Sequence, residues 1–467
     1  MKSLVLAEKP SVARDIARVL GCHKNISGAI EGSNYIVTWA LGHLVTLADP
    51  EEYDKKFKAW DMSYLPMVPK KWELVVIKQT SKQYHNVKTQ LFRKDVSEII
   101  IATDAGREGE LVARWILDKS GCHKPIRRLW ISSVTDKAIK EGFAHLKDGR
   151  AYNDLYHAAR SRAEADWLVG INATRALTCK YNAQLSCGRV QTPTLAMIAH
   201  REQQIRSFKP EDYYGLRCTT SVTGGSVGTM ASIVTWTWQQ KKSGSLRSFN
   251  KDLITGLDKK LKNQTLTVTD VHTLSKRTPS PGLYDLTELQ RDANKRFGFS
   301  AKETLNIMQS LYEHHKVLTY PRTDSRYIGT DIVPTIKERL KACNIGPYKK
   351  YIPELLKKPL KTSKAFVDDK KVSDHHAIIP TEEYVQMEHM SNNERKIYDL
   401  VVRRFISVLY PAFEYEQTTL KAEAAGETFT AKGKVIKAAG WKAVYTDAVS
   451  SGSSASLYDA YGDYEDS

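Results

Sequence analysis

The sequence predicts a multidomain protein of mixed class, in which an α/β domain at the N-terminus is followed by α+β segments. Three observations support this class. The first 120 residues alternate short apolar runs with helical patterns. Residues 153–177 carry apolar side chains at intervals of three and four, and residues 213–275 are rich in Thr, Val and aromatic residues. With 467 residues, the chain is long enough for about three domains.

Two strand–helix units begin the chain. The apolar run at 3–7 ends at Glu8 and is followed by the helical pattern SVARDIARVLG, which stops at a glycine. A second apolar run, SEIIIATD, ends at Asp104 and continues into the helical pattern REGELVARWILDKSG. Two carboxylates therefore stand at the C-terminal ends of two predicted strands, the edge of an open α/β sheet where ligands bind.

The rest of the chain alternates between helical and β-rich patterns. Residues 213–275 predict an antiparallel sheet, and 285–345 return to helix. Residues 419–445 predict further strands of the same sheet, so that a helical insertion interrupts one β-rich domain. The last 22 residues hold five acidic side chains, no basic ones and a Ser/Gly run, which predicts a disordered tail.

Bulk composition restricts the partner and the compartment. The net charge of +17 favours a polyanion such as nucleic acid, without separating a DNA enzyme from an RNA binder or a ribosome-associated protein. No stretch approaches the ~18 apolar residues that span a bilayer, and the N-terminus becomes charged too soon for a secretory signal. The six cysteines form no C-x-x-C pair, which argues against a zinc ribbon. We expect a cytoplasmic protein with reduced thiols and no membrane partner.

Acidic residues at the two strand ends are the candidate metal ligands. Glu8, Asp104, Glu108 and Glu110 offer the oxygen ligands that Mg²⁺ prefers, although Glu108 and Glu110 would also suit a helix N-terminus without any metal. Two acidic strand ends in a basic protein favour the metal site. Lys9 is either a cation for a phosphate and a leaving oxygen, or a surface lysine at a turn.

The segment SCGRVQTPT at 186–194 has the residues of a phosphate-binding loop. Gly188 would let the backbone approach a phosphate, Arg189 could make a bidentate contact, and Gln191 and Thr192 offer further hydrogen bonds. The alternative is a glycine turn before the helix that follows.

Tyr320 lies in the segment TYPRTDSR and is either a packing residue or a nucleophile. A phenol is mostly protonated at neutral pH because its pKa is near ~10. Arg322 would favour the phenolate and neutralise charge that builds up on a phosphate. Covalent attack would store the energy of the broken phosphodiester, so resealing would need no ATP. The sequence has no G-x-x-x-x-G-K-[ST] motif to bind ATP.

Seven ordered segments over some 380 residues decide between these possibilities. They read LAEKPSVARDIA, ATDAGREGELVAR, RAEADWLVGINATRAL, SCGRVQTPTLAMI, GFSAKETLNIMQSLYE, LTYPRTDSRYI and HHAIIPT. Together they resemble a type IA DNA topoisomerase of the bacterial topoisomerase III branch. The resemblance implies a toprim α/β domain, followed by helical and β-rich domains that form a clamp around DNA.

The family pattern implies a division of the chain and a role for each matching residue. The implied parts are a toprim catalytic domain (1–150), a helical DNA-binding base segment (151–212), a β-rich arch segment (213–280), a helical domain with the nucleophilic tyrosine (281–405), a β-rich arch return (406–445) and the acidic tail (446–467). The implied catalytic residues are Tyr320, which forms a 5′-phosphotyrosine bond, with Glu8, Lys9, Arg322 and His375. The implied Mg²⁺ ligands are Glu8, Asp104 and Glu108. The implied DNA contacts are Ser186, Cys187, Gly188, Arg189, Val190, Gln191, Trp60, Trp167 and Arg175.

This sequence departs from the family pattern in two places. Many members have a third carboxylate where Gly106 stands, so we expect one Mg²⁺ and leave a second ion open. Members continue for well over a hundred residues after the segment KAAGWKAVY, where the similarity stops here. The resemblance implies Mg²⁺-dependent, ATP-independent cleavage and passage of single-stranded or underwound DNA near the bacterial nucleoid. The alternatives are a non-catalytic remnant that binds single strands, and a partial enzyme that cleaves and rejoins DNA or acts on RNA.

Overall fold

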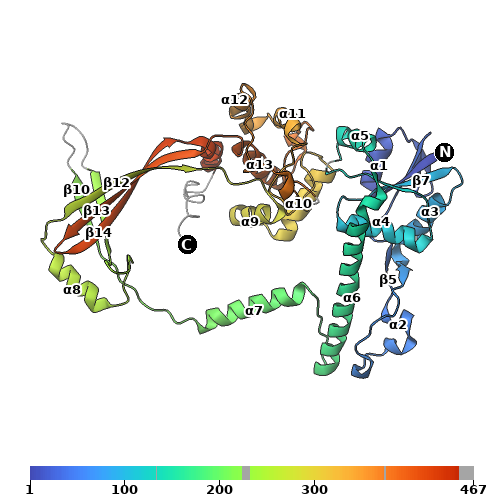
Figure 1. Cartoon of the computed structure of the whole chain (residues 1–467), viewed down its shortest axis with the longest axis horizontal. Coiled ribbons are helices and arrows are strands. Elements are labelled where there is room, and N and C mark those ends of the chain that lie inside the picture. The colour runs from blue at the N-terminus through green and yellow to red at the C-terminus, as the bar shows by residue number, and fades with distance from the viewer. Residues whose placement is uncertain (133, 223–231, 373–374, 452–467) are drawn as a thin grey trace. The chain divides into compact units, whose positions relative to one another are not determined.

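The computed structural model describes residues 1–132, 134–222, 232–372 and 375–451 (Figure 1). The chain divides into two compact units. The first unit comprises Met1–Ala199 and Gly282–Ile406, and the second comprises His200–Pro281 and the chain from Ser407 onward. In the first unit, we call residues 1–150 the N-terminal domain and residues 282–406 the tyrosine segment. No helix among the described residues is both long and apolar enough to cross a membrane.

A seven-stranded sheet forms the centre of the N-terminal domain. Its strand order is β2-β3-β4-β1-β7-β8-β9, and β1 is parallel to both of its neighbours, β4 and β7. The strands are β1 (Lys2–Ala7), β2 (Lys24–Ile26), β3 (Ala29–Glu31), β4 (Tyr35–Trp39), β7 (Val96–Ala102), β8 (Ile126–Arg128) and β9 (Lys147–Asp148). Because β1 lies in the centre, the parallel pairs place the ends of β1 and β7 at the same edge of the sheet.

Both faces of this sheet are covered, which explains why β1 is an uninterrupted apolar run. Leu4 and Leu6 belong to one buried cluster and Val5 and Ala7 to another, as the two-residue period of a strand requires. The helices of this domain are α1 (Pro10–Val19), α3 (Ser81–Leu91), α4 (Arg107–Ser120) and α5 (Asp136–Ala144). Side chains of α1 lie in the second cluster, and those of α3 and α4 lie in the first.

An extension at residues 45–76 leaves the domain and lies along the long helix α6 (Asn153–Tyr181) (Figure 1). The extension contains β5 (Val45–Leu47), α2 (Pro50–Tyr53) and β6 (Leu74–Val76). The side-chain amide of Asn172 in α6 holds both the N–H and the C=O of Met67. After α6, a loop leads to α7 (Gln191–Ser207), on which no residue is buried.

The tyrosine segment is helical, and Tyr320 lies outside its helices. The helices are α9 (Leu286–Phe297), α10 (Ala301–Glu313), α11 (Ile336–Ala342), α12 (Ile352–Leu356) and α13 (Asn392–Ser407). The helical pattern of the sequence runs from 301 to 320, but α10 ends at Glu313. Lys316 then adopts a left-handed conformation with φ of 60°, which stops the helix and turns the chain towards Tyr320.

The second unit contains a five-stranded antiparallel sheet of order β10-β11-β14-β13-β12. Its strands are β10 (Arg217–Val222), β11 (Ser232–Gln239), β12 (Thr267–Thr278), β13 (Phe413–Ala424) and β14 (Glu427–Ala438). Strands from either side of the tyrosine segment pair with each other, β12 with β13 and β11 with β14. The turn between β13 and β14 uses Ala425 and Gly426, both with positive φ, which suits a two-residue hairpin.

The second unit also holds a helix that the β-rich pattern did not reveal. Helix α8 (Lys251–Leu261) packs Ile254 and Leu257 against Trp236 and Trp238 of β11. The short 3-10 helices of the chain are η1 (Lys55–Lys58), η2 (Met62–Tyr64), η3 (Lys78–Thr80), η4 (Gly149–Tyr152), η5 (Val333–Thr335), η6 (Gly346–Lys350), η7 (Asp369–Lys371), η8 (Met387–His389) and η9 (Gly440–Ser451). Of the predicted tail, residues 446–451 belong to η9, and 452–467 lie outside the described residues.

Candidate active site

The two acidic strand ends meet at the edge of the sheet. Ala7 and Ala102 are paired residues of β1 and β7, so the residues that follow them are neighbours. The backbone N–H of Asp104 donates to Glu8 Oε2 at 3.1 Å. Burial, and then the charge of Asp104, raises the pKa of Glu8 from 4.5 to about 7. Burial also raises the pKa of Asp104 above its usual range. Glu8 therefore titrates near neutral pH, as an acid–base group should.

Lys9 connects this edge to the tyrosine segment. Its ammonium group donates to Glu313 Oε1 and lies 3.8 Å from Asp104 Oδ2. Burial lowers the pKa of Lys9, but the charges of Asp104 and Glu313 outweigh this and leave the pKa above its usual value. Sequence reasoning missed Glu313, although an acidic residue at the C-terminal end of a helix is unfavourable unless a cation faces it.

Tyr320 packs against the N-terminal domain although more than 200 residues separate it from Asp104. Its backbone N–H donates to Ser132 O at 3.0 Å, and its ring meets Tyr312 edge-on with centroids 5.4 Å apart. Burial, and then the charges of Asp104 and Glu8, raises the pKa of the phenol above 10, while Arg322 opposes the shift. The phenol is therefore protonated at neutral pH, and removing its proton needs a base.

His375 stacks between two aromatic rings at the same place. Its ring lies 4.2 Å from Tyr320 and 6.3 Å from Trp130, between centroids. The side chain is buried, and neither ring nitrogen has a hydrogen-bond partner among the described residues. Burial, and then the charge of His376, lowers the pKa of His375 to about 4. The imidazole is therefore neutral at physiological pH.

The structure gives Glu108 and Glu110 partners other than Glu8 and Asp104. Glu108 is exposed and pairs with Arg162 at 3.2 Å and with His43 at 3.8 Å. The bond to His43, with the charge of Arg162, lowers its pKa despite partial burial. Among the described parts of the chain, no group of three or more His, Cys, Asp or Glu side chains is arranged to hold a metal ion.

Glu110 points into the core instead. Its side chain is fully buried and accepts from Arg114 Nε and Arg128 Nε, each at 2.9 Å. Arg128 in turn donates to the carbonyls of Thr103 and Asp104 at 2.8 Å. This buried pair therefore holds the end of β7 in place. Sequence reasoning did not single out Arg128, and an arginine in a short strand gives no local signal of burial.

The predicted DNA-binding loop forms a separate group on α6. Cys187 N–H donates to Thr174 Oγ1 at 2.9 Å, and Arg189 Nε donates to Asp166 Oδ1 at 2.6 Å. Within the loop, Gln191 Nε2 donates weakly to Ser186 Oγ at 3.4 Å. Arg189 and the backbone of Cys187 thus contact α6, and Ser186, Arg189, Val190 and Gln191 remain exposed. An exposed loop on a fixed base is suitable for contact with a polymer.

Trp60, Trp167 and Arg175 lie at the contact between the extension and α6. The guanidinium of Arg175 lies 5.1 Å above the Trp60 ring and donates to Phe57 O. Trp167 Nε1 donates to Ala48 O at 2.9 Å. Arg175 is only 6% exposed and Trp167 is half-buried, so both have a structural role that the sequence did not reveal. Trp60 is 50% exposed, which leaves part of its ring accessible.

Comparison with known proteins identifies the family of this fold. Residues 150–461 match the DNA topoisomerase family, and residues 3–134 match the toprim domain. The chain belongs to the bacterial DNA topoisomerase family. It is 64% identical to DNA topoisomerase 3 of Bacillus cereus and 60% identical to that of Bacillus subtilis, in each case over 95% of this chain. The predicted resemblance to the topoisomerase III branch is therefore confirmed.

The aligned region includes nearly all of this chain but only part of each relative. The chain spans 59% of the Bacillus cereus topoisomerase and 60% of the Bacillus subtilis one. A solved structure of full-length topoisomerase I from Thermotoga maritima superposes with a TM-score of 0.67 at 22% identity. That alignment covers 95% of this chain and 67% of the other. The mixed α/β and α+β fold, with a toprim domain at the N-terminus, is thus confirmed.

Proposed function

We propose that this chain cleaves and rejoins one strand of DNA through Tyr320, as a topoisomerase of the type IA class. One observation carries the proposal. The tyrosine segment brings Tyr320 close enough to Glu8 and Asp104, at the edge of the toprim sheet where ligands bind, for their charges to raise the pKa of its phenol. Lys9 lies 3.8 Å from the Asp104 carboxylate. A residue that served only for packing would not need two carboxylates close enough to affect its phenol.

The chemistry requires a nucleophile, a proton acceptor and a proton donor. The phenol oxygen of Tyr320 would bond to phosphorus and lose its proton, while the bond from phosphorus to the 3′ oxygen breaks. Glu8 titrates at about 7, so it can exchange this proton at neutral pH. Lys9 would donate the proton that the leaving 3′ oxygen takes up. The phosphotyrosine bond keeps the energy of the phosphodiester, so rejoining needs no ATP.

Glu8 and Asp104 would hold one Mg²⁺. They fit a divalent cation because burial raises the pKa of both carboxyl groups and the charge of Asp104 raises that of Glu8 further, so a cation between them would stabilise the two ionised forms. Glu108 would join them only after leaving Arg162. The cation supplies positive charge against the phosphate in the transition state. Arg322, which is exposed and close enough to affect the pKa of Tyr320, supplies a second positive charge.

We propose that the substrate is single-stranded or underwound DNA. The net charge of +17 favours a polyanion, the loop at 186–191 offers phosphate contacts, and the half-exposed Trp60 offers a surface for base stacking. Passing a second strand through the break would relax negative supercoils or unlink DNA circles. The relatives named DNA topoisomerase 3 support this assignment.

The test is replacement of Tyr320 by Phe, which removes only the hydroxyl group. The wild-type chain and the variant are incubated with a 5′-end-labelled single-stranded oligonucleotide and Mg²⁺, then denatured. We expect shortened labelled strands and a protein–DNA adduct from the wild type, and neither from the variant. Tyr35→Phe is the matched control because Tyr35 is a half-buried tyrosine of β4 that packs on Phe143, away from this site. Cleavage by the Tyr320→Phe variant would refute the proposal.

Plasmid relaxation, measured in parallel, tests the second half of the proposal. Cleavage together with relaxation would support strand passage by this chain. Cleavage without relaxation would restrict the proposed function to cutting and rejoining.

A further inference from the structure

The active site is assembled from two parts that the chain connects only through a long detour. Residues 151–281 separate the N-terminal domain from the tyrosine segment, and most of the second unit lies in that stretch. Non-covalent contacts alone therefore hold Tyr320 against Glu8 and Asp104. We call the contact surface between these two parts the boundary. Any contact across it favours the docked state, in which Tyr320 lies against Glu8 and Asp104, over an undocked state.

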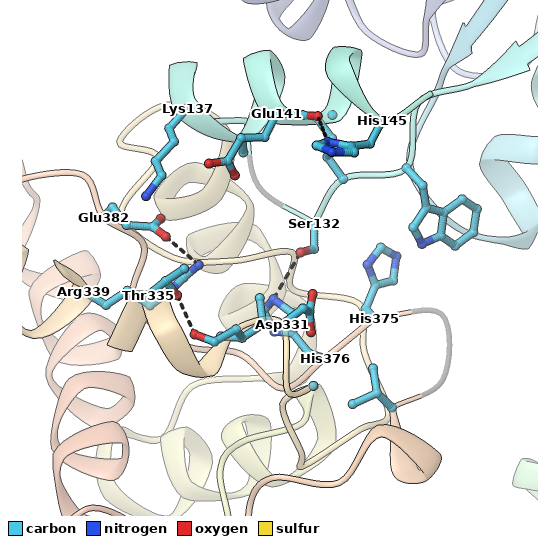
Figure 2. Close-up of a pocket in the computed structure, with 17 residues that line it drawn as sticks. Ser132, Lys137, Glu141, His145, Asp331, Thr335, Arg339, His375, His376 and Glu382 are labelled. Atoms are coloured by element: carbon cyan, nitrogen blue, oxygen red, sulfur yellow. Dashed lines mark hydrogen bonds and ion pairs between the residues drawn. The ribbon is translucent and has the colours of Figure 1, made fainter. Parts of the chain in front are cut away.

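The boundary is incompletely packed, as Figure 2 shows. A cavity of about 490 Å³ lies between the two parts, with Lys137 and Glu141 of α5 on one side and Arg339 and Glu382 of the tyrosine segment on the other. Beside it, Ser132 Oγ is 3.1 Å from His376 Nε2. Because the two parts do not touch across the cavity, the contacts around it hold them together.

An ion pair between described residues crosses this boundary outside the residues of the proposed chemistry. Lys316 Nζ lies 2.6 Å from Asp15 Oδ1 of α1, and the two side chains are 19% and 21% exposed. Such partial burial reduces screening by water and salt relative to a surface pair. Arg18 lies 3.6 Å from Asp15 on the same helix and is held by Asp136 at 2.6 Å. Asp136 also interacts electrostatically with Lys316.

The backbone holds Lys316 in place for this contact. The φ of 60° is an unfavourable conformation for a residue with a side chain, and it persists where the surroundings enforce it. Thr381 Oγ1 donates to Lys316 O at 2.6 Å, and Leu318 forms a bridge with Pro380. Four residues after Lys316 comes Tyr320. The position of the lysine and the position of the nucleophile are therefore connected through a short, supported segment.

We infer that Lys316 and Asp15 are positioning residues that keep Tyr320 docked on the N-terminal domain. The inference rests on the proposed function, in which rejoining requires the tyrosine to return to Glu8 and Lys9. Loss of the pair favours the undocked state, so the covalent intermediate persists longer and rejoining slows. Neither residue touches the reacting atoms.

The test measures docking directly, without any turnover. Spectroscopic labels are placed through a non-natural amino acid at the exposed positions Lys119 and Lys337, because six cysteines would compete for thiol labels. The labels report a short distance when the tyrosine is docked and a long one when it is undocked. We expect Asp15→Asn and Lys316→Gln each to raise the ratio of undocked to docked molecules by about three- to tenfold. The charge exchange Asp15→Lys with Lys316→Glu should restore the docked distances in part, because the new pair forms while Arg18 and Asp136 oppose it. Higher salt should increase the fraction of molecules at the long distance in the wild type, but not in Lys316→Gln.

A matched variant and a kinetic measurement complete the test. Glu354→Gln removes a carboxylate of α12 that pairs at 3.0 Å with Lys357, the residue that caps the same helix, and it should leave the distances unchanged. Rejoining, measured after salt is added to a cleavage reaction, should slow in Asp15→Asn in proportion to the loss of the docked fraction, which the measured distances give. Unchanged distances in both single variants would overturn the inference. Because this readout needs no cleavage, it separates failure of the inference from failure of the proposed chemistry.

Discussion

Replacing Glu8 by Gln should stabilise the protein while it abolishes the proposed chemistry. In the folded chain, burial and the charge of Asp104 raise the pKa of Glu8 from 4.5 to about 7. Below pH 4.5 the carboxyl group is protonated in both the folded and the unfolded state. Between pH 4.5 and 7 the unfolded state loses this proton first, so the free energy of unfolding decreases as pH rises. Above pH 7 the accumulated loss is about 3 kcal/mol.

Glutamine carries no titratable proton, so Glu8→Gln should remove this loss. At pH 8 and without Mg²⁺, we expect the variant to melt about 5 °C above the wild type, given the size of the first unit. At pH 4.5 the two melting temperatures should agree. Glu52→Gln, an exposed carboxylate of α2, is the control for a lost charge and should shift neither value. Equal melting temperatures of the Glu8 variant and the wild type at pH 8 would refute the reasoning.

Mg²⁺ provides an independent check of the same residue. A cation bound by Glu8 and Asp104 stabilises the folded state by mass action, so Mg²⁺ should raise the melting temperature of the wild type at pH 8. In Glu8→Gln the increase should be much smaller because one of the two carboxylates is gone. An equal increase in both proteins would place the binding site elsewhere.

Three further substitutions test the support around the site. Arg128→Met removes one partner of the fully buried Glu110 and should lower the free energy of unfolding by about 3 kcal/mol, measured by chemical denaturation. Gly109→Ala would place a Cβ atom 2.0 Å from Asp104 O, so Asp104 must move. We expect this variant to lose Mg²⁺-dependent stabilisation in a melting experiment. Trp167→Ala should destabilise the contact with the extension by about 3 kcal/mol and increase proteolysis within residues 45–76.

The elements predicted from the sequence agree with the structure where a local pattern decides them. The apolar runs became β1 and β7, and the helical repeat after residue 150 became the single helix α6. The prediction failed at α8, which lies within a stretch that composition assigns to strands. There, packing of two apolar residues onto β11 decides the structure, and a short amphipathic helix between strands carries little signal.

The candidate site shows the same division. Glu8 and Asp104 were predictable as neighbours because each ends a strand and parallel strands end at one edge. The surroundings of Glu108 and Glu110 were not predictable, because helix geometry alone does not say which face of α4 meets solvent. Glu110 is the second residue after Glu108, so the two point to different sides, and only the packing of Arg128 shows which side is the core.

By itself, the sequence determined the family, two strand–helix units of the N-terminal domain, and the residue types available for phosphoryl transfer. These depend on local patterns and ordered motifs. Only the tertiary structure decided that Glu313 faces Lys9, that Glu108 pairs with Arg162 and that Lys316 reaches Asp15. Most of these partners are far apart along the chain. Their meeting depends on how separately folded parts pack, and packing free energy leaves no local pattern in the residues that it brings together.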